Sequence, residues 1–168
     1  MYYGDIMILN RSIFLKVPKL EELKFTELLL SDPETMRFNE KWGGTVSFPK
    51  KKWNNFYEDY INNPDRHYFH IYNLEGIFVG EVSTKYDESF QSYVLNIKVL
   101  HRFRGNNHGF DALEAFLTFL FEDVGVEKIV DNVGHDSVAG IHLLKQFGFI
   151  EKDTTDEYVL LELKREDF

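Results

Sequence analysis

Cysteine is absent from this chain of 168 residues, and proline occurs only four times. Without cysteine there can be no disulfide framework, no thiolate zinc site and no cysteine nucleophile, and the redox compartment stays undetermined. No apolar run is long enough to cross a bilayer, because Asp111, Glu114 and Thr118 interrupt the most apolar stretch, residues 110–121. The first ten residues lack the basic and apolar segments of a signal peptide, so we expect a cytoplasmic protein without a membrane partner.

Basic residues are also in the minority. The chain has 19 Lys and Arg against 28 Asp and Glu, which gives a formal charge of −9. Binding to nucleic-acid phosphates needs a broad basic face, so this balance argues against a nucleic-acid partner. An amine-bearing partner fits better, although an acidic surface often serves solubility alone.

Long linkers, internal repeats and low-complexity segments are missing as well. The length suits one domain, and the hydrophobic content of 43% with 16% aromatic residues supplies material for its core. We therefore predict a single domain that spans residues 1–168.

The hydrophobic pattern predicts the element order β-α-α-β-β-β-α-β-α-β-β. Short runs of β-branched and aromatic residues indicate the strands, and apolar residues at helical spacing indicate the helices. This order is typical of an α+β domain with a mixed, mainly antiparallel sheet. The predicted strands are residues 12–17, 66–73, 77–85, 92–100, 127–133, 149–152 and 157–164, the predicted helices are residues 18–32, 48–65, 110–124 and 137–147, and residues 39–47 are expected to form a mobile loop.

One segment between a predicted strand and a predicted helix departs from the acidic character of the chain. Residues 101–110, HRFRGNNHGF, contain two arginines, two histidines and two glycines but no carboxylate. The backbone N–H groups of a helix N-terminus attract phosphates, and Gly105 and Gly109 allow a left-handed backbone and a close approach. The segment can therefore cradle a pyrophosphate, although turn geometry alone also explains glycine and asparagine here. A P-loop is excluded, because the two glycines stand one residue too close together.

The turn and the elements that follow it resemble the GNAT superfamily of N-acetyltransferases. The acetyl-CoA motif of that family is a strand, an Arg/Gln-x-x-Gly-x-Gly/Ala turn and a helix, which corresponds here to residues 104–109, with Asn107 in place of the first motif glycine. The phrase HLLKQFGF at residues 142–149 matches the end of the family pattern. With DPETMRFNEKW at residues 32–42, the chain is most similar to the branch that includes ribosomal-protein N-terminal acetyltransferases.

The resemblance implies a GNAT-like acyl-CoA N-acyltransferase fold, in which the strands at residues 92–100 and 127–133 form a central, splayed parallel pair. It also implies acetyl-CoA as co-substrate and direct transfer of the acetyl group to a primary amine of a small molecule or of a peptide N-terminus. The turn would bind the pyrophosphate, and the end of the preceding strand would offer main-chain groups to the pantetheine arm. The cofactor-binding residues implied in this way are Val99, Leu100, Arg104, Gly105, Asn106, Asn107, His108, Gly109 and Phe110.

Two catalytic residues common in the family are missing. Leu144 stands where many relatives have a tyrosine that acts as general acid, and residues 92–100 contain no carboxylate to act as base. We predict Glu81 on the neighbouring strand as the base, with a solvent-facing role as the alternative. Ser137, which opens the last helix, is the predicted residue for orienting the thiol. A catalytically degenerate coenzyme A-binding module is therefore the alternative function, and an interaction protein without cofactor is a third.

The histidines and the aromatic residues carry further expectations. His67 and His70 stand three apart on a predicted strand and point to opposite faces, so we expect no metal site. Aromatic residues at helical spacing in residues 53–60 are expected to pack in the core. Trp42, in the predicted loop, is a candidate wall of the acceptor site. The sequence does not identify the amine, and it is compatible with a monomer or with a homodimer.

Overall fold

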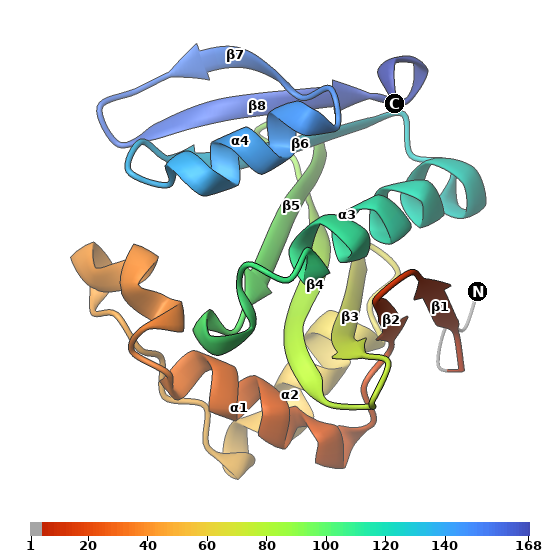
Figure 1. The fold of residues 1–168 in the computed structure, drawn as a ribbon, viewed down its shortest axis with the longest axis vertical. Helices are drawn as coiled ribbons and strands as arrows, with labels where there is room; N and C mark the ends of the chain where they lie inside the picture. The colour runs from red at the N-terminus through yellow and green to blue at the C-terminus, as the bar shows by residue number, and fades with distance from the viewer. Residues whose placement is uncertain (1–4) are drawn as a thin grey trace.

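The structure is a computed structural model that describes residues 5–168. Eight strands form one sheet in the order β1-β2-β3-β4-β5-β6-β8-β7 (Figure 1). The strands are β1 (Met7–Asn10), β2 (Ile13–Lys16), β3 (Arg66–Asn73), β4 (Phe78–Asp87), β5 (Ser92–Val99), β6 (Lys128–Gly134), β7 (Ile150–Thr154) and β8 (Tyr158–Lys164). The helices are α1 (Leu23–Ser31), α2 (Trp53–Phe56, continued by a π-helical turn at Tyr57–Ile61), α3 (His108–Thr118, continued by a π-helical turn at Phe119–Val124) and α4 (Val138–Gln146).

The joint between β5 and β6 is short and parallel. Only Tyr93↔Ile129 and Val94↔Val130 are paired between these two strands, whereas every other neighbouring pair in the sheet is antiparallel. Beyond the second pair the strands separate. The predicted α+β class, the mixed sheet and its central splayed parallel pair are therefore confirmed.

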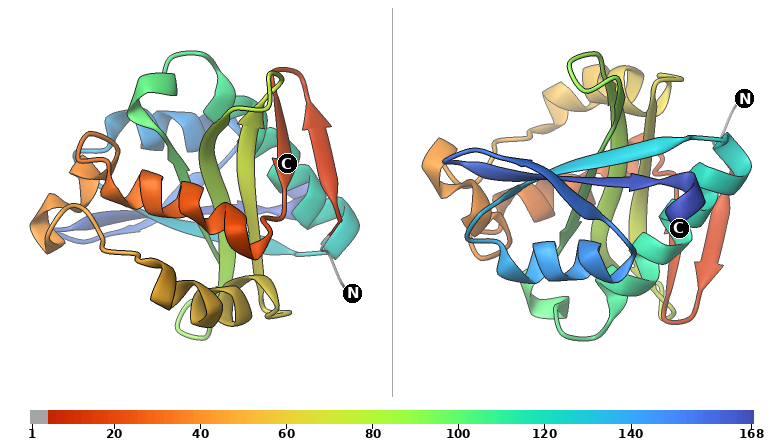
Figure 2. Two further views of the ribbon diagram at one scale, coloured as in Figure 1. Left: turned by 90° about the horizontal axis from the view of Figure 1, so that it is seen from below. Right: turned by 90° about the horizontal axis from the view of Figure 1, so that it is seen from above.

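The helices cover the two faces of the sheet unequally. Figure 2 shows α1 and α2 on one face of the half formed by β1–β5, and α3 on the other face of that half. Helix α4 lies on the half formed by β6, β8 and β7, on the same face of the sheet as α3. A Cβ atom at Gly140 of α4 would lie 3.6 Å from the side chain of Val133 on β6, and one at Gly148 would lie 3.4 Å from Leu163 on β8.

The main core lies between α3, α4 and the sheet. The apolar face predicted for residues 110–124 is buried there, and Gly125, with φ of 83°, ends the helical segment in a left-handed conformation as expected. Its largest fully buried side chains include Phe69, Phe116, Phe121, Leu113, Leu117 and Leu120. The aromatic side chains of α2 form a smaller cluster around Phe48 and Trp53, which confirms their prediction as core residues.

Two elements differ from the predictions. The strand β1 was not predicted. Its Met7 and Leu9 are exposed, so it has no buried apolar pattern, and main-chain pairing with β2 defines it. Residues Thr35–Trp42 form a 3₁₀ helix, η2, where a loop was expected from residue 39. Gly43, with φ of 106°, ends η2. Within residues 5–168, no helix is long and apolar enough to cross a membrane.

Candidate functional site

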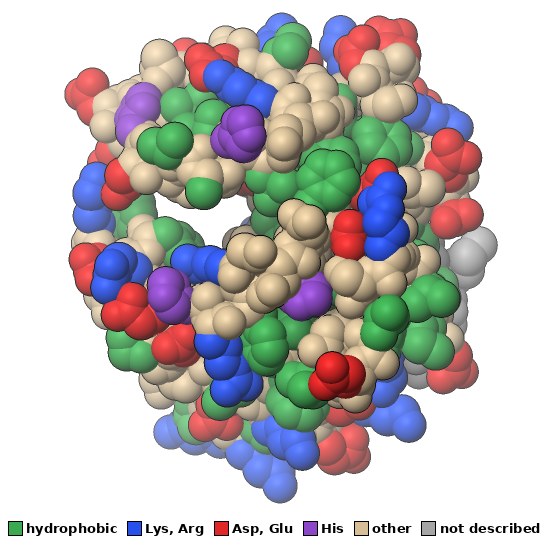
Figure 3. Space-filling model, viewed as in Figure 1, with side chains coloured by type: hydrophobic (Ala, Val, Ile, Leu, Met, Phe, Trp, Pro, Cys, Tyr) green, Lys and Arg blue, Asp and Glu red, His purple; other side chains and the backbone are tan. Residues whose placement is uncertain are grey.

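An opening passes through the molecule where β5 and β6 separate. Figure 3 shows it in the view of Figure 1, bordered by the start of α4 above and by η2 and the short helix η5 (His101–Phe103) below. The predicted cofactor turn follows η5 directly and leads into α3. The divergence of the two strands therefore creates a passage beside this turn.

The turn presents an uninterrupted series of main-chain donors. Gly105 has φ of 85° and Asn107 has φ of 61°, so asparagine takes the left-handed conformation in place of the motif glycine. Helix α3 starts at His108 without a side-chain cap. Among residues 5–168, no acceptor is found for the N–H groups of residues 105–110. Free N–H groups at a helix N-terminus bind phosphates well, so the turn fits the pyrophosphate of coenzyme A.

Gly109 brings three elements together at this site, but it does not have a left-handed backbone. A Cβ atom there would lie 3.5 Å from Val99 at the end of β5 and 3.9 Å from Leu143 of α4. The next residue, Phe110, stacks on Phe147 at the end of α4, with ring centroids 4.6 Å apart. The start of α3 is thus fixed against both sides of the passage.

Arg104 is exposed, and its guanidinium bridges two main-chain segments. Its Nε donates to the carbonyl of Val99 at 3.1 Å, and its Nη2 donates to the carbonyl of Thr35 in η2 at 3.3 Å. These bonds leave part of the guanidinium free for an anion, since arginine has five N–H donors. Asn106 stabilises the same turn, because its Nδ2 donates to the carbonyl of Phe103 at 3.2 Å.

His108 contacts the β1–β2 hairpin. One of its ring nitrogens, Nδ1, is hydrogen-bonded to Ser12 at 3.1 Å. The buried carboxylate of Asp111, one turn further along α3, accepts from Ser12 and forms an ion pair with Arg11 at 3.3 Å. The hairpin therefore holds the first turn of α3 in place, and His108 has this structural contact in addition to its predicted role.

The main-chain groups of Leu100 already have hydrogen-bond partners within the protein. Its N–H donates to the carbonyl of Val79 at 2.9 Å, and its own carbonyl accepts from Phe103 at 2.9 Å. The side chain is buried with Met36 and Phe78 in the cluster below η5. These bonds anchor the end of β5 and engage the Leu100 N–H, while its carbonyl keeps a second lone pair. A contact of Leu100 with the pantetheine arm stays a prediction.

Glu81 is buried, so the solvent-facing alternative for this residue is wrong. The Tyr68 hydroxyl donates to one of its carboxylate oxygens, and Lys98 Nζ donates to the other at 3.0 Å. Only 7% of the Glu81 side chain and 15% of the Lys98 side chain are exposed. Burial alone would raise the pKa of Glu81, but the Lys98 charge and the two hydrogen bonds outweigh it and hold this pKa below its ordinary value. Glu81 is therefore ionised and fully paired.

The hydrogen bonds around Glu81 continue under α1. Thr26 of α1 is hydrogen-bonded to Tyr68 and to His70 Nε2, each at 2.9 Å. Burial lowers the pKa of His70 to about 4, so this histidine is neutral at pH 7. His67 lies on the opposite face and is bonded to Thr84, as expected from the spacing of the two histidines. No group of three or more potential metal ligands occurs in the part of the chain that the structure describes.

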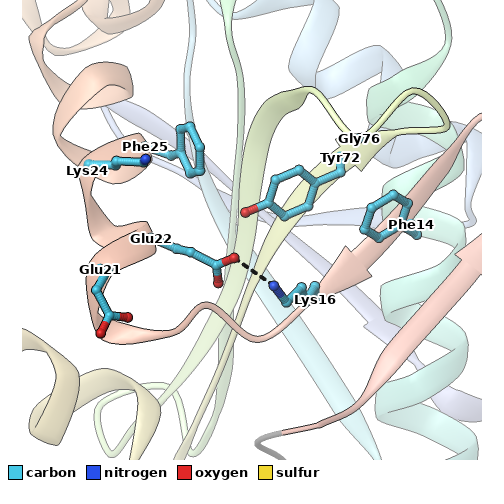
Figure 4. Close-up of a pocket in the computed structure, with 8 residues that line it drawn as sticks. All are labelled: Phe14, Lys16, Glu21, Glu22, Lys24, Phe25, Tyr72 and Gly76. Atoms are coloured by element: carbon cyan, nitrogen blue, oxygen red, sulfur yellow. Dashed lines mark hydrogen bonds and ion pairs between the residues drawn. The ribbon is translucent and has the colours of Figure 1, made fainter.

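A separate pocket of 420 Å³ opens at the outer end of these hydrogen bonds. Tyr72, whose hydroxyl lies 3.4 Å from His70 Nδ1, forms one of its walls. Figure 4 shows the ion pair between Lys16 and Glu22, at 2.6 Å, across this pocket. The remaining lining residues are Phe14, Glu21, Lys24, Phe25 and Gly76. The pocket lies on the α1 side of the sheet and does not include the cofactor turn.

Ser137 and Leu144 lie where the family resemblance places them, at the start and in the middle of α4. Ser137 is half-buried at the N-cap position and makes no side-chain capping bond. Its Oγ would lie 2.7 Å from a Cβ atom at Gly140, so the hydroxyl occupies space that a larger residue at position 140 would fill. Leu144 is buried in the core and offers no acidic proton.

Three residues at the site were not identified from the sequence. Lys98 and Tyr68 belong to strands read only as apolar patterns, so their pairing with Glu81 was not foreseen. Asp131 occupies an inward position of β6 between Ile129 and Val133. An acidic residue at an inward position of an apolar strand is visible in the sequence and could have identified Asp131.

The helix η2, which borders the passage on the side opposite α4, carries two exposed aromatic side chains. Trp42 is 66% exposed and Phe38 is 52% exposed. They stand four residues apart on this short helix. Trp42, the predicted wall of the acceptor site, is thus available to solvent, as is Phe38.

Comparison with known proteins agrees with this geometry. The family model of the GNAT acetyltransferase domain matches residues 13–150. The spermidine N-acetyltransferase of Vibrio cholerae, solved in complex with coenzyme A and spermine, has 15% identity and a TM-score of 0.78 over 93% of this chain and 97% of that chain. A search among curated proteins found no match.

Two further solved structures have the same fold. A GNAT-family acetyltransferase from Bacillus anthracis has 12% identity and a TM-score of 0.76 over 96% of this chain and 99% of that chain. A Vibrio cholerae protein assigned as a ribosomal-protein-serine acetyltransferase has 16% identity and a TM-score of 0.75 over 96% of this chain and 98% of that chain. At such low identities the likeness concerns the fold.

Proposed function

Because the chain belongs to the GNAT acetyltransferase family, we propose that it transfers the acetyl group of acetyl-CoA directly to a primary amine of a small molecule or of a peptide N-terminus. The observation that carries this proposal is the series of N–H groups at residues 105–110, which have no acceptor in the described part of the chain and lie beside the passage between β5 and β6. The solved complex of the similar spermidine N-acetyltransferase with coenzyme A and spermine supports both classes of ligand.

In this proposal the turn holds the pyrophosphate. Gly105, Asn106, Asn107, His108, Gly109 and Phe110 contribute main-chain N–H groups, and Arg104 adds its charge. Val99 lines the passage at the end of β5, and Ser137 orients the thiol from the other side. When bound, acetyl-CoA supplies the activated acyl group, so the protein needs neither a covalent nucleophile nor a metal.

The assignment of Glu81 as general base stays a prediction. A general base works best when its pKa lies near the operating pH, and the pKa of Glu81 is held low by Lys98 and Tyr68. This favours a role in which Glu81 stays charged and positions Lys98 beside the passage. If it is the base, Glu81→Gln should lower kcat and remove the acidic limb of the pH–rate profile. A merely positioning role predicts a lower kcat with that limb unchanged.

The acceptor is proposed to enter along η2. Its exposed aromatic pair, Phe38 and Trp42, offers a surface for the amine substrate, and the overall charge of −9 favours a cationic one. Trp42→Ala should raise KM for the amine and leave KM for acetyl-CoA unchanged. Leu74→Ala, which removes an equally exposed apolar side chain from the β3–β4 turn, serves as the control. An unchanged amine KM in Trp42→Ala would contradict this assignment.

A catalytically inactive coenzyme A-binding module is the second candidate. It is favoured by the absence of an acid at Leu144 together with the full pairing of Glu81. Measurement of free thiol released from acetyl-CoA in the presence of an amine panel distinguishes the two. A binding module shows affinity for coenzyme A without thiol release.

The experiment that tests cofactor binding is a thermal-shift titration with acetyl-CoA and coenzyme A. At a hundredfold excess over Kd, binding should stabilise the native chain by about 2.7 kcal/mol. Arg104→Glu/Gly109→Glu should abolish the shift, because it places two carboxylates at the pyrophosphate position. Lys152→Glu makes the same type of charge change on exposed β7 and should retain the shift. No shift of the native chain at millimolar ligand would overturn the proposal.

A further inference from the structure

Asp131 lies at the point where β5 and β6 separate. The last pair between these strands is Val94↔Val130, so Asp131 is the first residue of β6 beyond the paired part of the two strands. On its other side it is paired with Leu161 of β8. Its backbone therefore borders the passage at its closed end.

The side chain of Asp131 belongs to the face that α4 covers. Residues of a strand alternate between faces, so Asp131 shares its face with Ile129 and Val133, and opposite it on β8 stands the buried Leu161. The helix starts over Val133, near Gly140, and the segment just after it lies over Leu163, near Gly148. Asp131 thus lies on the face of β6 that α4 covers, between the strand positions near the start of α4 and just after its end.

The carboxyl group of Asp131 has no charged or hydroxyl partner. Within residues 5–168, no hydrogen bond or ion pair joins it to another side chain. The charged residues nearest on β6 and β8, Lys128 and Glu162, lie on the opposite face and are paired with each other at 4.0 Å. Its neighbours on its own face, Ile129, Val133 and Leu161, are apolar, as is Leu144 of α4. Burial raises the pKa of Asp131 to about 8, so at pH 7 the group is mainly a neutral acid.

We propose that Asp131 is the general acid that protonates the departing thiolate of coenzyme A. This inference rests on the proposed acetyltransferase function. The amine nitrogen forms the new bond to the carbonyl carbon, the carbon–sulfur bond breaks with its electron pair moving to sulfur, and Asp131 gives its proton to that sulfur. The nitrogen loses its extra proton to water, and a solvent proton restores Asp131.

Three other residues that could be considered as proton donors are less suited to this role. Leu144 has no proton to give, and the Ser137 hydroxyl is a far weaker acid than a carboxyl group. Glu81 is ionised and points to the opposite face of the sheet, where it is paired with Lys98. Of these residues, Asp131 is the carboxylic acid that lies on the α4 side of the gap and has its pKa raised.

A direct test measures the ionisation of Asp131 by ¹³C NMR of its carboxyl carbon, with Asp131→Asn identifying the signal. We expect a titration midpoint near pH 8 in the free protein. Coenzyme A should shift this midpoint, and desulfo-coenzyme A, which lacks only the sulfur, should shift it differently. A midpoint near pH 4, or identical shifts with the two ligands, would overturn the inference. If neither ligand binds the native chain, the proposed function itself fails.

A kinetic test uses the same variant with two acetyl donors. Removing a general acid lowers turnover by about 10²-fold or more, so Asp131→Asn should lose about that factor with acetyl-CoA. With an acetyl aryl thioester, whose thiolate leaves without protonation, the loss should be much smaller. Asp123→Asn, at an exposed position after α3, is the control and should keep the native rate. Equal losses with both donors, or no loss with acetyl-CoA while coenzyme A still binds, would contradict a proton-donating role.

Discussion

Glu81 and Asp131 are both acidic side chains within the sheet, and they lie on the two sides of the passage and on opposite faces. Glu81 is the more deeply buried, yet its pKa is lowered, because Lys98 and Tyr68 bind both of its oxygens. Asp131 is half-buried, yet its pKa is raised to about 8, because its face offers only apolar neighbours. The partners of a buried carboxyl group, more than its depth, decide its charge.

The two carboxyl groups are therefore suited to different roles. A permanently charged carboxylate can hold a lysine in position, whereas a neutral carboxyl group can donate a proton at physiological pH. Substitutions that remove Lys98, the partner of Glu81, or the carboxyl group of Asp131 test whether these neighbours set the two pKa values.

The largest effect is expected from Lys98→Met, which leaves Glu81 buried without its ion partner. Loss of one member of a buried pair costs about 3–5 kcal/mol, and the pKa of Glu81 should rise toward the behaviour of Asp131. Urea unfolding at pH 7 measures the loss of stability. Lys85→Met, on the exposed side of the same hairpin, should change stability by less than about 0.5 kcal/mol. Equal effects of the two variants would refute the importance of the pair.

A smaller effect of opposite sign is expected from Asp131→Asn. In the unfolded chain the carboxyl group loses its proton near pH 4, and in the folded chain near pH 8. Between these values the folded state binds one more proton, so native stability falls as pH rises. The variant should therefore become more stable than the native chain from pH 4 to pH 8, by about 2 kcal/mol at most, since water reaches this half-buried group.

Thermal unfolding of the native chain and of Asp131→Asn from pH 4 to above pH 8 measures this difference in stability. The difference between their Tm values should vanish near pH 4 and level off above pH 8. A difference that does not depend on pH would show that the carboxyl group of Asp131 ionises normally in the folded chain.

The smallest effect is expected from Thr26→Val, which removes the hydroxyl shared by Tyr68 and His70. A lost buried hydrogen bond costs about 1–2 kcal/mol. Thr118→Val is the matched control, because the Thr118 hydroxyl donates to its own helix at an exposed position. If both variants are equally stable, the bonds under α1 contribute little to holding Tyr68 against Glu81.

Much of the fold could be predicted from the sequence because strong local patterns agree with it. The strand at Arg66–Asn73 and the helix from His108 to Val124 follow from β-rich and helical apolar spacing, and Gly125 ends the latter as expected. The strand β1 could not be predicted in this way. Its apolar residues are exposed, and its main-chain pairing with β2 involves residues that no local pattern connects.

The site was predictable where it depends on the backbone and unpredictable where it depends on neighbours. Glycine at position 105 and asparagine at position 107 indicate a left-handed turn, and the structure has one. Arg104, in contrast, bonds to Thr35, which lies 69 residues earlier, and Glu81 meets Lys98 across two strands. Such contacts arise only from tertiary packing, as does the occupied backbone of Leu100.

The short parallel pairing of β5 with β6 changes the number of strand edges in the sheet. A sheet ordinarily has two edge strands, and this one has β1 and β7 in those positions. Because β5 and β6 are joined by only two pairs, their remaining lengths behave as two additional edges that face each other inside the molecule. Edge strands accept any extended chain that carries amide groups. The interior of this sheet can therefore be completed by an extended ligand that carries amide groups.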